Sequence, residues 1–310
     1  MNFVLIFLSF YCIHLSPAHI SLMATPPMRC LFVSDLHGRT ERYRSLFLMI
    51  RDEHPAAVFL GGDLLPSHLL SMSDEFDDFI NDFLAVEFRS LQRSLGERYP
   101  KLFFILGNDD ARAQEADMVK WAERDLWQYV HNCRAPFGPF LVYGYSFVPP
   151  TPFQLKDWER YDVSRFVDPG CSHPYEGYRT LPQDERELRQ ATIADDLKQL
   201  VREEDLSSTF CLFHAPPYQT HLDRAALDGH MVDAAPLDVH VGSIAIRRFI
   251  ESRQPLVTLH GHVHESARIT GSWKERIGRT MAFSAAHDGP ELAVIQFDPG
   301  DLESATRLLI

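Results

Sequence analysis

The hydrophobic positions in the first third of the chain form short apolar runs separated by amphipathic stretches. Arg29–Ser34, Ala56–Leu60 and Lys101–Leu106 are mostly apolar and have the length of buried strands. Glu41–Asp52 and Asp74–Tyr99 repeat apolar side chains at the spacing of helices that cover a sheet. Because strands and helices alternate, the pattern predicts right-handed βαβ units and a largely parallel sheet.

The rest of the chain predicts more elements of both kinds around one irregular segment. The expected strands are Phe140–Phe147, Thr209–Phe213, Leu256–Leu259, Thr280–Ser284 and Leu292–Phe297, and the expected helices are Gln183–Glu204 and Ile244–Glu251. Pro149 to Pro182 is rich in proline and aromatic residues and has no clear period, and such a long loop is usually functional. Its rings either stack on a substrate base or form a small core of their own. They are Phe153, Trp158, Tyr161, Phe166, Tyr175 and Tyr178.

Composition narrows the class of protein. The 310 residues are 45% hydrophobic and 24% charged, which is ordinary for a globular chain with a substantial core. A net charge of -13 argues against general nucleic-acid binding, which depends on basic patches. The five cysteines are scattered, so they favour a reducing compartment over a disulfide framework or a zinc knuckle. Cys30 and Cys211 lie in apolar runs and are expected in the core.

The first 27 residues have two interpretations. Phe3 to Leu15 is apolar and has the length of a signal peptide, but no Lys or Arg precedes Arg29. The run is also short for a stable membrane span. We therefore expect a cytoplasmic protein with an extended start, and export is the alternative if residues 1–27 act as a signal peptide. The remainder, 28–310, is expected to be a single domain with a long insert at about 149–182.

Five polar clusters directly follow predicted strands. They are Ser34–Gly38, Gly61–Asp63, Gly107–Asp110, Phe213–Pro216 and His260–His264. In open α/β sheets, ligands bind at the carboxyl ends of the strands. The side chains are carboxylates, imidazoles and one amide without a thiolate, a set that suits hard or borderline metal ions. Each cluster alone is common turn chemistry, but five in succession predict a metal site.

The order of these motifs resembles the calcineurin-like metallophosphoesterase superfamily. Its signature is Asp-x-His, Gly-Asp, Gly-Asn-His-Asp/Glu, a lone His and Gly-His-x-His, and the match runs from Ser34 to His264. The resemblance implies a four-layer α/β/β/α sandwich of two mixed β-sheets flanked by helices. It also implies two divalent metal ions, for which manganese, iron and zinc are all suitable. The implied ligands are Asp35, His37 and His264 for the first ion, Asn108, His214 and His262 for the second, and Asp63 for both.

Two departures from the family pattern affect the expected chemistry. Asp63 is followed by two leucines and lacks the Asp-Arg-Gly of the Ser/Thr phosphatases. Asp109 occupies the position of a histidine that the family generally assigns to the leaving group or the phosphate. A carboxylate beside two cations favours its ionised form, so Asp109 is expected to be a poor proton donor. Histidines in the loops after His214 are alternative acids or ordinary surface residues, namely His221, His230 and His240.

The resemblance implies hydrolysis of a phosphoester by attack of a metal-bridged hydroxide. We expect a small, nucleotide-like substrate and a preference for diesters or pyrophosphates, whose leaving groups need little protonation. Arg39 and Arg112 lie beside ligand loops and either contact the phosphate or are solvated surface residues. A partner-binding scaffold of the same fold and a nuclease of the same superfamily are the alternatives. The complete set of seven ligands favours catalysis, and the sequence predicts no oligomeric state.

Overall fold

Two six-stranded sheets pack against each other in the computed structural model, which describes residues 28–67 and 76–310. The first sheet has the order β14 (Asp301–Leu309), β13 (Ala293–Asp298), β1 (Cys30–Val33), β2 (Ala57–Gly61), β3 (Lys101–Ile105) and β4 (Gln128–Tyr129). The second has the order β11 (Lys274–Ile277), β12 (Thr280–Ser284), β10 (Val257–His260), β7 (Thr209–Phe213), β6 (Phe140–Tyr145) and β5 (Cys133–Phe137). A small hairpin pairs β8 (Met231–Val232) with β9 (Ala235–Pro236).

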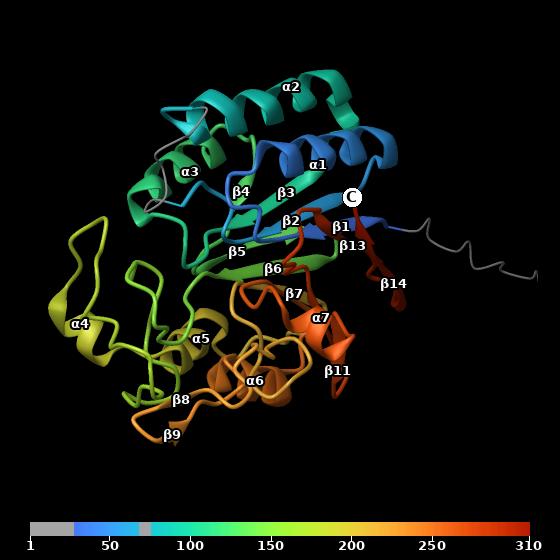
Figure 1. Cartoon of the computed structure of the whole chain (residues 1–310). Helices are drawn as coiled ribbons and strands as arrows, with labels where there is room; N and C mark the ends of the chain where they lie inside the picture. The colour runs from blue at the N-terminus through green and yellow to red at the C-terminus, as the bar shows by residue number, and fades with distance from the viewer. Residues whose placement is uncertain (1–27, 68–75) are drawn as a thin grey trace, which may run out of the picture.

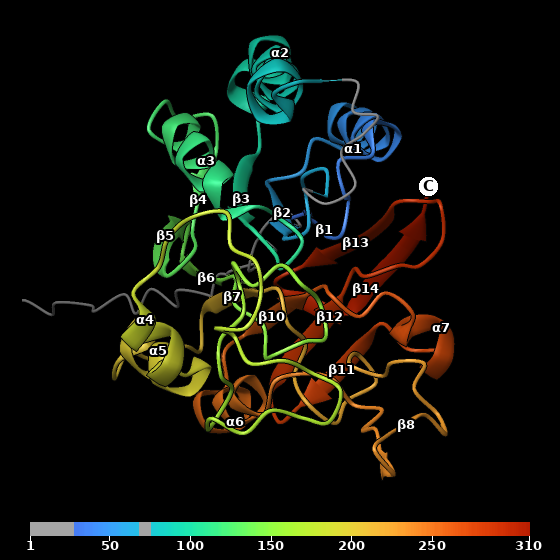
Figure 2. The same ribbon diagram turned by 60° about the vertical axis from the view of Figure 1, so that its left-hand side comes forward.

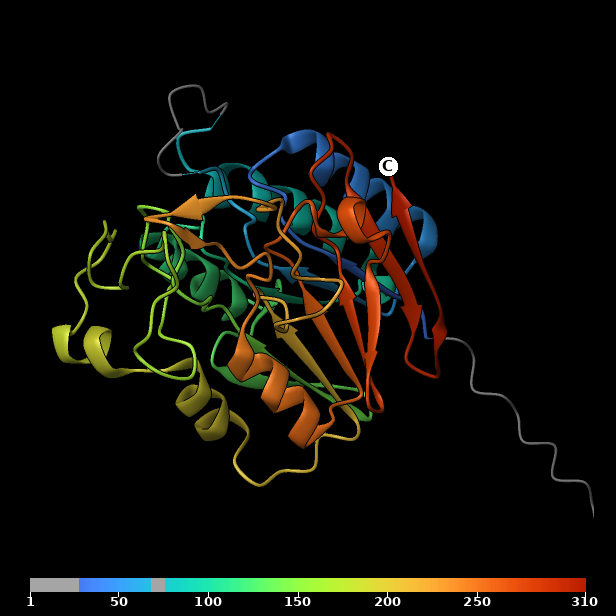
Figure 3. The ribbon, with the colours of Figure 1, turned by 60° about the horizontal axis from the view of Figure 1, so that its bottom comes forward.

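Helices cover the outer face of each sheet. The α-helices of the described residues are α1 (Thr40–Glu53), α2 (Ala85–Leu95), α3 (Glu115–Ala122), α4 (Glu185–Gln190), α5 (Ile193–Val201), α6 (Ile244–Arg253) and α7 (Ser266–Thr270). Figure 1 shows α1, α2 and α3 over the first sheet, and Figure 3 shows α5 and α6 in front of the second. The predicted four-layer α/β/β/α sandwich of two mixed sheets is confirmed.

Each sheet has a block of four parallel strands with antiparallel strands beside it, on one side in the first sheet and on both sides in the second. β1, β2, β3 and β4 run parallel, as do β12, β10, β7 and β6. β13 and β14 on one sheet, and β5 and β11 on the other, run antiparallel to their neighbours. Prediction of a largely parallel sheet therefore holds for this block in each sheet. The carboxyl ends of the parallel strands carry the loops that matter for function.

The core between the sheets is aromatic. Phe59 and Phe103 stack with ring centroids 5.2 Å apart, and Phe210 from the second sheet meets Phe59 edge-on at 5.6 Å. Along β1, Cys30 packs into this inter-sheet core while Leu31 packs under the helices. Both faces of the strand are buried, which explains why its sequence is a continuous apolar run. Cys30 and Cys211 are fully buried, as predicted.

Two predicted helices differ from the structure. Gln183–Glu204 is not one helix: α4 and α5 are separated by Ala191 and Thr192 in extended conformations. The Thr192 hydroxyl accepts a hydrogen bond from the Asp195 N–H and begins α5 as an N-cap. The helix predicted over Asp74–Tyr99 begins at Phe79 as a wide π-type turn and continues as α2 to Leu95. Residues 74–75, like the predicted apolar segment at 1–27, lie outside the described residues.

The insert at 149–182 consists of turns and isolated bridges without a helix or a ladder of its own. In Figure 2 it is the yellow-green segment in front of the second sheet. Trp158 and Tyr161 are buried, whereas Phe153, Phe166 and Tyr178 are exposed. Trp158 belongs to the main hydrophobic core, and stacking of the exposed rings on a substrate stays a prediction. Within 28–67 and 76–310, no helix has the length and apolar character needed to cross a membrane.

Candidate metal centre

The loops after β1 and β2 are held side by side by their own backbones. The Asp35 N–H donates to the Gly62 carbonyl at 2.9 Å, and the His37 N–H donates to the Asp63 carbonyl at 2.8 Å. The parallel pairing of the two strands thus continues beyond their ends. Backbone hydrogen bonds alone therefore fix the positions of Asp35, His37 and Asp63 relative to one another.

The candidate ligands occupy unusual backbone conformations. Asp35, His37, Asp63 and His262 have φ values of 58°, 49°, 52° and 76°. Non-glycine residues rarely adopt this left-handed region, and such strain concentrates at functional sites. The ligand residues themselves, together with Gly38 and Gly62, make the sharp turns at these strand ends.

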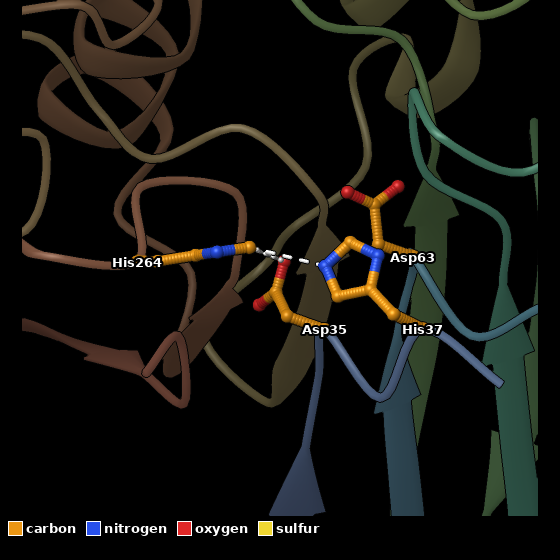
Figure 4. Close-up of side chains that lie close together, drawn as sticks. All are labelled: Asp35, His37, Asp63 and His264. Atoms are coloured by element: carbon orange, nitrogen blue, oxygen red, sulfur yellow. Dashed lines mark hydrogen bonds and ion pairs between the residues drawn. The ribbon is translucent and has the colours of Figure 1, made fainter. Parts of the chain in front are cut away.

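Asp35, His37, Asp63 and His264 form one compact group. Their four candidate ligand atoms lie within 4.8 Å of one another. His264 Nε2 is 3.3 Å from His37 Nε2 and 3.2 Å from Asp35 Oδ1. Figure 4 shows His264 reaching from the second sheet toward the three residues on the first. Two imidazole nitrogens and two carboxylates that face a common point fit a divalent cation.

His214 is the centre of a neighbouring group. Its Nε2 is 3.1 Å from Asn108 Oδ1 and 3.3 Å from Asp63 Oδ2. Its Nδ1 faces the Gly61 carbonyl at 2.8 Å, so Nε2 is the nitrogen directed at the centre. The His262 ring lies edge-on to His214, with centroids 5.3 Å apart. Asp63 therefore stands between this group and the first, where the family resemblance puts a bridging ligand.

Glycines create the space for these contacts. A Cβ on Gly107 would overlap Asp63 Oδ1 and would lie 2.6 Å from His214 Nε2. A Cβ on Gly261 would lie 2.7 Å from Asp35 Oδ2. Since no side chain fits at such distances, the backbone of these two loops can approach the ligands only at glycine.

Opposite charges perturb the titration of the site. Burial acts to lower the pKa of His37, but the hydrogen bond to Asp109 and the charges of Asp63 and Asp35 raise it to about 9. Burial likewise opposes ionisation of His214, and the charge and hydrogen bond of Asp63 raise its pKa to about 9. Burial lowers the pKa of His262 to about 3, assisted by the charge of His214. The carboxylates attract positive charge strongly, as a cation site requires.

Two buried residues that the sequence analysis missed support the ligand loops. The Asp110 carboxylate accepts hydrogen bonds from the backbone N–H groups of Leu64, Leu65 and Gly107 at 2.7–3.1 Å. It therefore ties the loop after β2 to the loop after β3. Burial, with the charge of Asp63, raises the pKa of Asp110. Its position after Gly-Asn-Asp was visible in the sequence, but its partners were not.

Arg42 is the second missed residue. Its guanidinium is buried and donates to the Asp35 carbonyl at 2.5 Å and to the Gly289 carbonyl at 2.6 Å. It thus joins the Asp35 turn to the loop that follows β12. A charged residue four positions before the core residue Leu46, on the same helical face, was the available signal.

The two arginines expected beside the ligand loops differ in their surroundings. Arg39 is exposed at the start of α1. Arg112 Nε is 3.5 Å from Glu115 Oε2, and its guanidinium lies 5.1 Å from the centre of the Trp158 ring. The contacts of Arg112 are therefore with α3 and the insert. In the described part of the chain neither arginine forms a hydrogen bond or ion pair with the seven candidate ligands, and a contact of either one with the phosphate stays a prediction.

The three loop histidines also differ from one another. His221 pairs with Glu275 at 3.0 Å, and His230 is exposed. His240 Nδ1 lies 2.8 Å from Asp223 Oδ1, a fully buried carboxylate. None of the three is hydrogen-bonded to a candidate ligand within the described residues, and only His240 is oriented by a buried acid.

The insert is attached to the loop that carries Asn108. Trp158 Nε1 donates to the Asp110 carbonyl at 2.9 Å, and the Arg112 N–H donates to Asp157 Oδ2 at 2.8 Å. Asp157 also accepts the Thr180 N–H at 2.9 Å. Since Trp158 and Asp157 are fully buried, the insert is a fixed wall beside this loop.

Two mixed sheets with acidic and imidazole side chains gathered at the ends of their parallel strands define the class of protein, an α/β sandwich with a candidate metal centre. The model of the family described as calcineurin-like phosphoesterase matches residues 28–266. The chain therefore belongs to the calcineurin-like phosphoesterase family, a family of metallophosphoesterase hydrolases.

Individual relatives are distant. An uncharacterized protein of Methanocaldococcus jannaschii is 37% identical over 79 residues, which are 25% of this chain and 30% of that protein. The chain thus matches less than a third of that relative's length. The crystal structure of TT1561 of Thermus thermophilus has 16% identity and a TM-score of 0.52, over 91% of this chain and 99% of that one. Another solved structure has 17% identity and a TM-score of 0.55 over the same shares. Both likenesses concern the fold alone.

Proposed function

We propose that the protein is a binuclear metal-dependent phosphoesterase that prefers phosphodiesters with good leaving groups. The proposed ligands are Asp35, His37 and His264 for one ion, Asn108, His214 and His262 for the other, and Asp63 for both. Bound divalent cations would supply a water of lowered pKa and neutralise the charge of the substrate phosphate. The observation that carries the proposal is the compact group of Asp35, His37, Asp63 and His264.

The candidate ligands are buried on one side of the centre and partly exposed to solvent on the other. Asp35, Asp63 and His214 are buried, while the His37 and His264 side chains are 21% and 34% exposed. A phosphoester would therefore approach past these two histidines. The buried carboxylates would hold the cations, and the edge of the site would remain open to the leaving group.

The preference for diesters rests on Asp109. The family's histidine is absent at this position, and both oxygens of Asp109 have partners, His37 Nδ1 at 3.1 Å and Ser67 Oγ at 3.0 Å. A carboxylate engaged in this way is a poor donor of a proton to an alkoxide. Aryl and nucleotide diesters, as well as pyrophosphates, have leaving groups that depart without full protonation. They are therefore the substrates we propose.

The exposed rings of the insert support an aromatic substrate group. Phe153 and Phe166 are 54% and 70% exposed on a segment that follows β6. β6 runs parallel to β7, which ends just before His214, so the insert and this ligand leave the sheet at the same end. We propose that one of these rings packs against the aryl or base group of the substrate.

The test compares bis-p-nitrophenyl phosphate, p-nitrophenyl phosphate and glycerol phosphate as substrates, with added Mn²⁺ and with chelator. We expect Mn²⁺-dependent turnover, fastest with the diester, that is lost in Asp63→Asn. Asp205→Asn is the matched control, because Asp205 is an exposed residue before β7, at the far end of that strand from His214. Faster turnover of glycerol phosphate than of the diester would refute the preference.

Two other outcomes would replace the proposal. A folded protein that binds Mn²⁺ but hydrolyses none of the three substrates would favour the partner-binding scaffold. Salt-dependent binding and cleavage of DNA or RNA would favour the nuclease.

A further inference from the structure

The Asp109 side chain touches the ligand group without belonging to it. Its Oδ2 lies 3.1 Å from His37 Nδ1, and its Oδ1 accepts a hydrogen bond from Ser67 Oγ at 3.0 Å. Its backbone N–H separately donates to Asp63 Oδ1 at 2.8 Å. Asp109 therefore contacts one candidate ligand through its side chain and another through its main chain.

These contacts determine which nitrogen of His37 faces the centre. A carboxylate at Nδ1 accepts the proton of that nitrogen, so the lone pair available for a metal is on Nε2. His37 Nε2 is the atom that lies 3.3 Å from His264 Nε2, inside the ligand group. A histidine that donates its second N–H to a carboxylate is the usual arrangement around metal ions in proteins.

Ser67 completes the arrangement from the loop after β2. Its hydroxyl holds the Asp109 oxygen that does not face His37. The Asp109 side chain is 29% exposed, so without this bond it would compete with water for its orientation. Ser67, Asp109 and His37 thus form a chain of three residues from three loops, those after β2, β3 and β1.

We propose that Asp109, held by Ser67, is a positioning residue that presents His37 Nε2 to the first metal ion, in place of the proton-donating role of the family's histidine. This inference rests on the metal centre of the proposed function. With Asp109 at this position the site lacks the family's general acid, but His37 is held in the orientation that a metal ligand needs. Both oxygens of the side chain are engaged by these two partners.

The experiment measures metal binding directly, by titrating chelator-treated protein with Mn²⁺ in competition with a chromophoric chelator. Asp109→Ala should weaken one of two Mn²⁺ equivalents by about 10–100-fold, the usual effect of removing such a partner. Asp109→Asn should retain most of the affinity, because its amide oxygen still accepts the Nδ1 proton. Ser67→Ala should have a smaller effect than Asp109→Ala in the same direction.

A matched control and a second readout separate positioning from general damage. Asp205 is also paired with a serine, Ser207 at 2.8 Å, but lies before β7, so Asp205→Ala should bind Mn²⁺ as the wild type does. In Co²⁺-loaded protein, Asp109→Ala should change the visible absorption, which reports ligand geometry, while Asp109→Asn should preserve it. If the alanine variant fails to fold, the Mn²⁺ affinities of wild type, Asp109→Asn and Ser67→Ala are compared instead.

The outcomes distinguish this inference from the proposed function. If Asp109→Ala binds both Mn²⁺ equivalents with wild-type affinity, the positioning role is wrong, whatever the activity. If the wild type binds two equivalents and the alanine variant loses one, the role stands even when no phosphoester is cleaved. Two bound equivalents in the wild type without cleavage would contradict the proposed phosphoesterase activity and leave the positioning role intact.

Discussion

The ligand loops and the insert at 149–182 leave the sheets at the same end but are held by different forces. The loops after β1 and β2 are fixed by backbone hydrogen bonds, such as Asp35 N–H to the Gly62 carbonyl. The insert is fixed by buried polar side chains, among them Lys156 Nζ, which lies 2.6 Å from Glu159 Oε2. The loops after β1 and β2 therefore take their shape mainly from backbone pairing, with the Asp110 and Arg42 side chains as further supports. The insert has only isolated backbone bridges and depends more on buried side-chain partnerships.

The largest effect is expected in the insert. Lys156 and Glu159 are a fully buried ion pair, and Lys156 also donates to the Thr151 carbonyl at 2.7 Å. Lys156→Met should destabilise the protein by about 3 kcal/mol or more, because it leaves a buried carboxylate without its cation. Denaturant unfolding measures the loss. The double variant with Glu159→Gln should recover most of it, and an additive double variant would contradict the pairing.

The next effect is expected in the ligand loops. Gly107→Ala should reduce kcat/KM for the proposed substrate by about 100-fold, or about 2.7 kcal/mol, because its Cβ would strike Asp63 and His214. Steady-state kinetics and bound metal measure the change. Gly300→Ala is the control, since its Cβ would meet only Asp298 Oδ1, at 3.3 Å. Equal activity of the two variants would mean that the loops tolerate a change of backbone shape.

A smaller effect is expected where the two regions meet. Trp158→Phe removes the indole N–H that reaches the Asp110 carbonyl and leaves that buried carbonyl without this donor. We expect a loss of about 2 kcal/mol in unfolding free energy. A several-fold fall in kcat should accompany it if the insert positions the loop of Asn108. Thermal unfolding and kinetics on the same samples show whether stability and activity change together; unchanged kcat would limit the insert to a structural role.

The smallest effect is a pH dependence under the insert. His131 is surrounded by Trp158 and Phe147, and burial, with the charges of Arg112 and Arg160, lowers its pKa from 6.5 to about 3. Below pH 6.5 His131 therefore binds a proton in the unfolded state but stays neutral in the folded state. The unfolding free energy is therefore not reduced by His131 above pH 6.5, and it decreases as the pH falls from 6.5 toward 3.

His131→Gln should remove this dependence, because glutamine stays neutral and can still accept the Ser146 N–H. Between about pH 6.5 and about pH 5.5 the wild type should lose about 1 kcal/mol more unfolding free energy than the variant. Urea unfolding at both pH values measures the difference. Identical slopes would show that folding does not lower the pKa of His131.

The two regions also differ in how far their sequence predicts them. Strands such as Thr209–Phe213 and Thr280–Ser284 were predicted to the residue, because an apolar run bounded by polar residues is a local signal. The candidate ligands stand directly after such strands, so their convergence also followed from the sequence. Confirmation of the family and of the two-sheet sandwich extends this agreement to the whole fold.

The parts that escaped prediction depend on contacts between distant residues. Trp158 and Asp110 are 48 positions apart, and no periodicity links them. Arg42 bonds to Gly289 across 247 positions, so its place on the buried helical face was visible in the sequence but this partner was not. The break between α4 and α5 was different: Thr192 is an ordinary N-cap residue, and a search for caps inside the long amphipathic stretch could have found it.

The measurement that tests the binuclear centre most directly is the recovery of activity in chelator-treated protein as Mn²⁺ is added in known equivalents. Hydrolysis of bis-p-nitrophenyl phosphate and bound metal would be followed in the same samples. A binuclear centre predicts that activity reaches its maximum at two bound ions per chain and that Asp63→Asn reaches neither the activity nor the stoichiometry. Full activity with one ion, or without any ion, would contradict the binuclear centre.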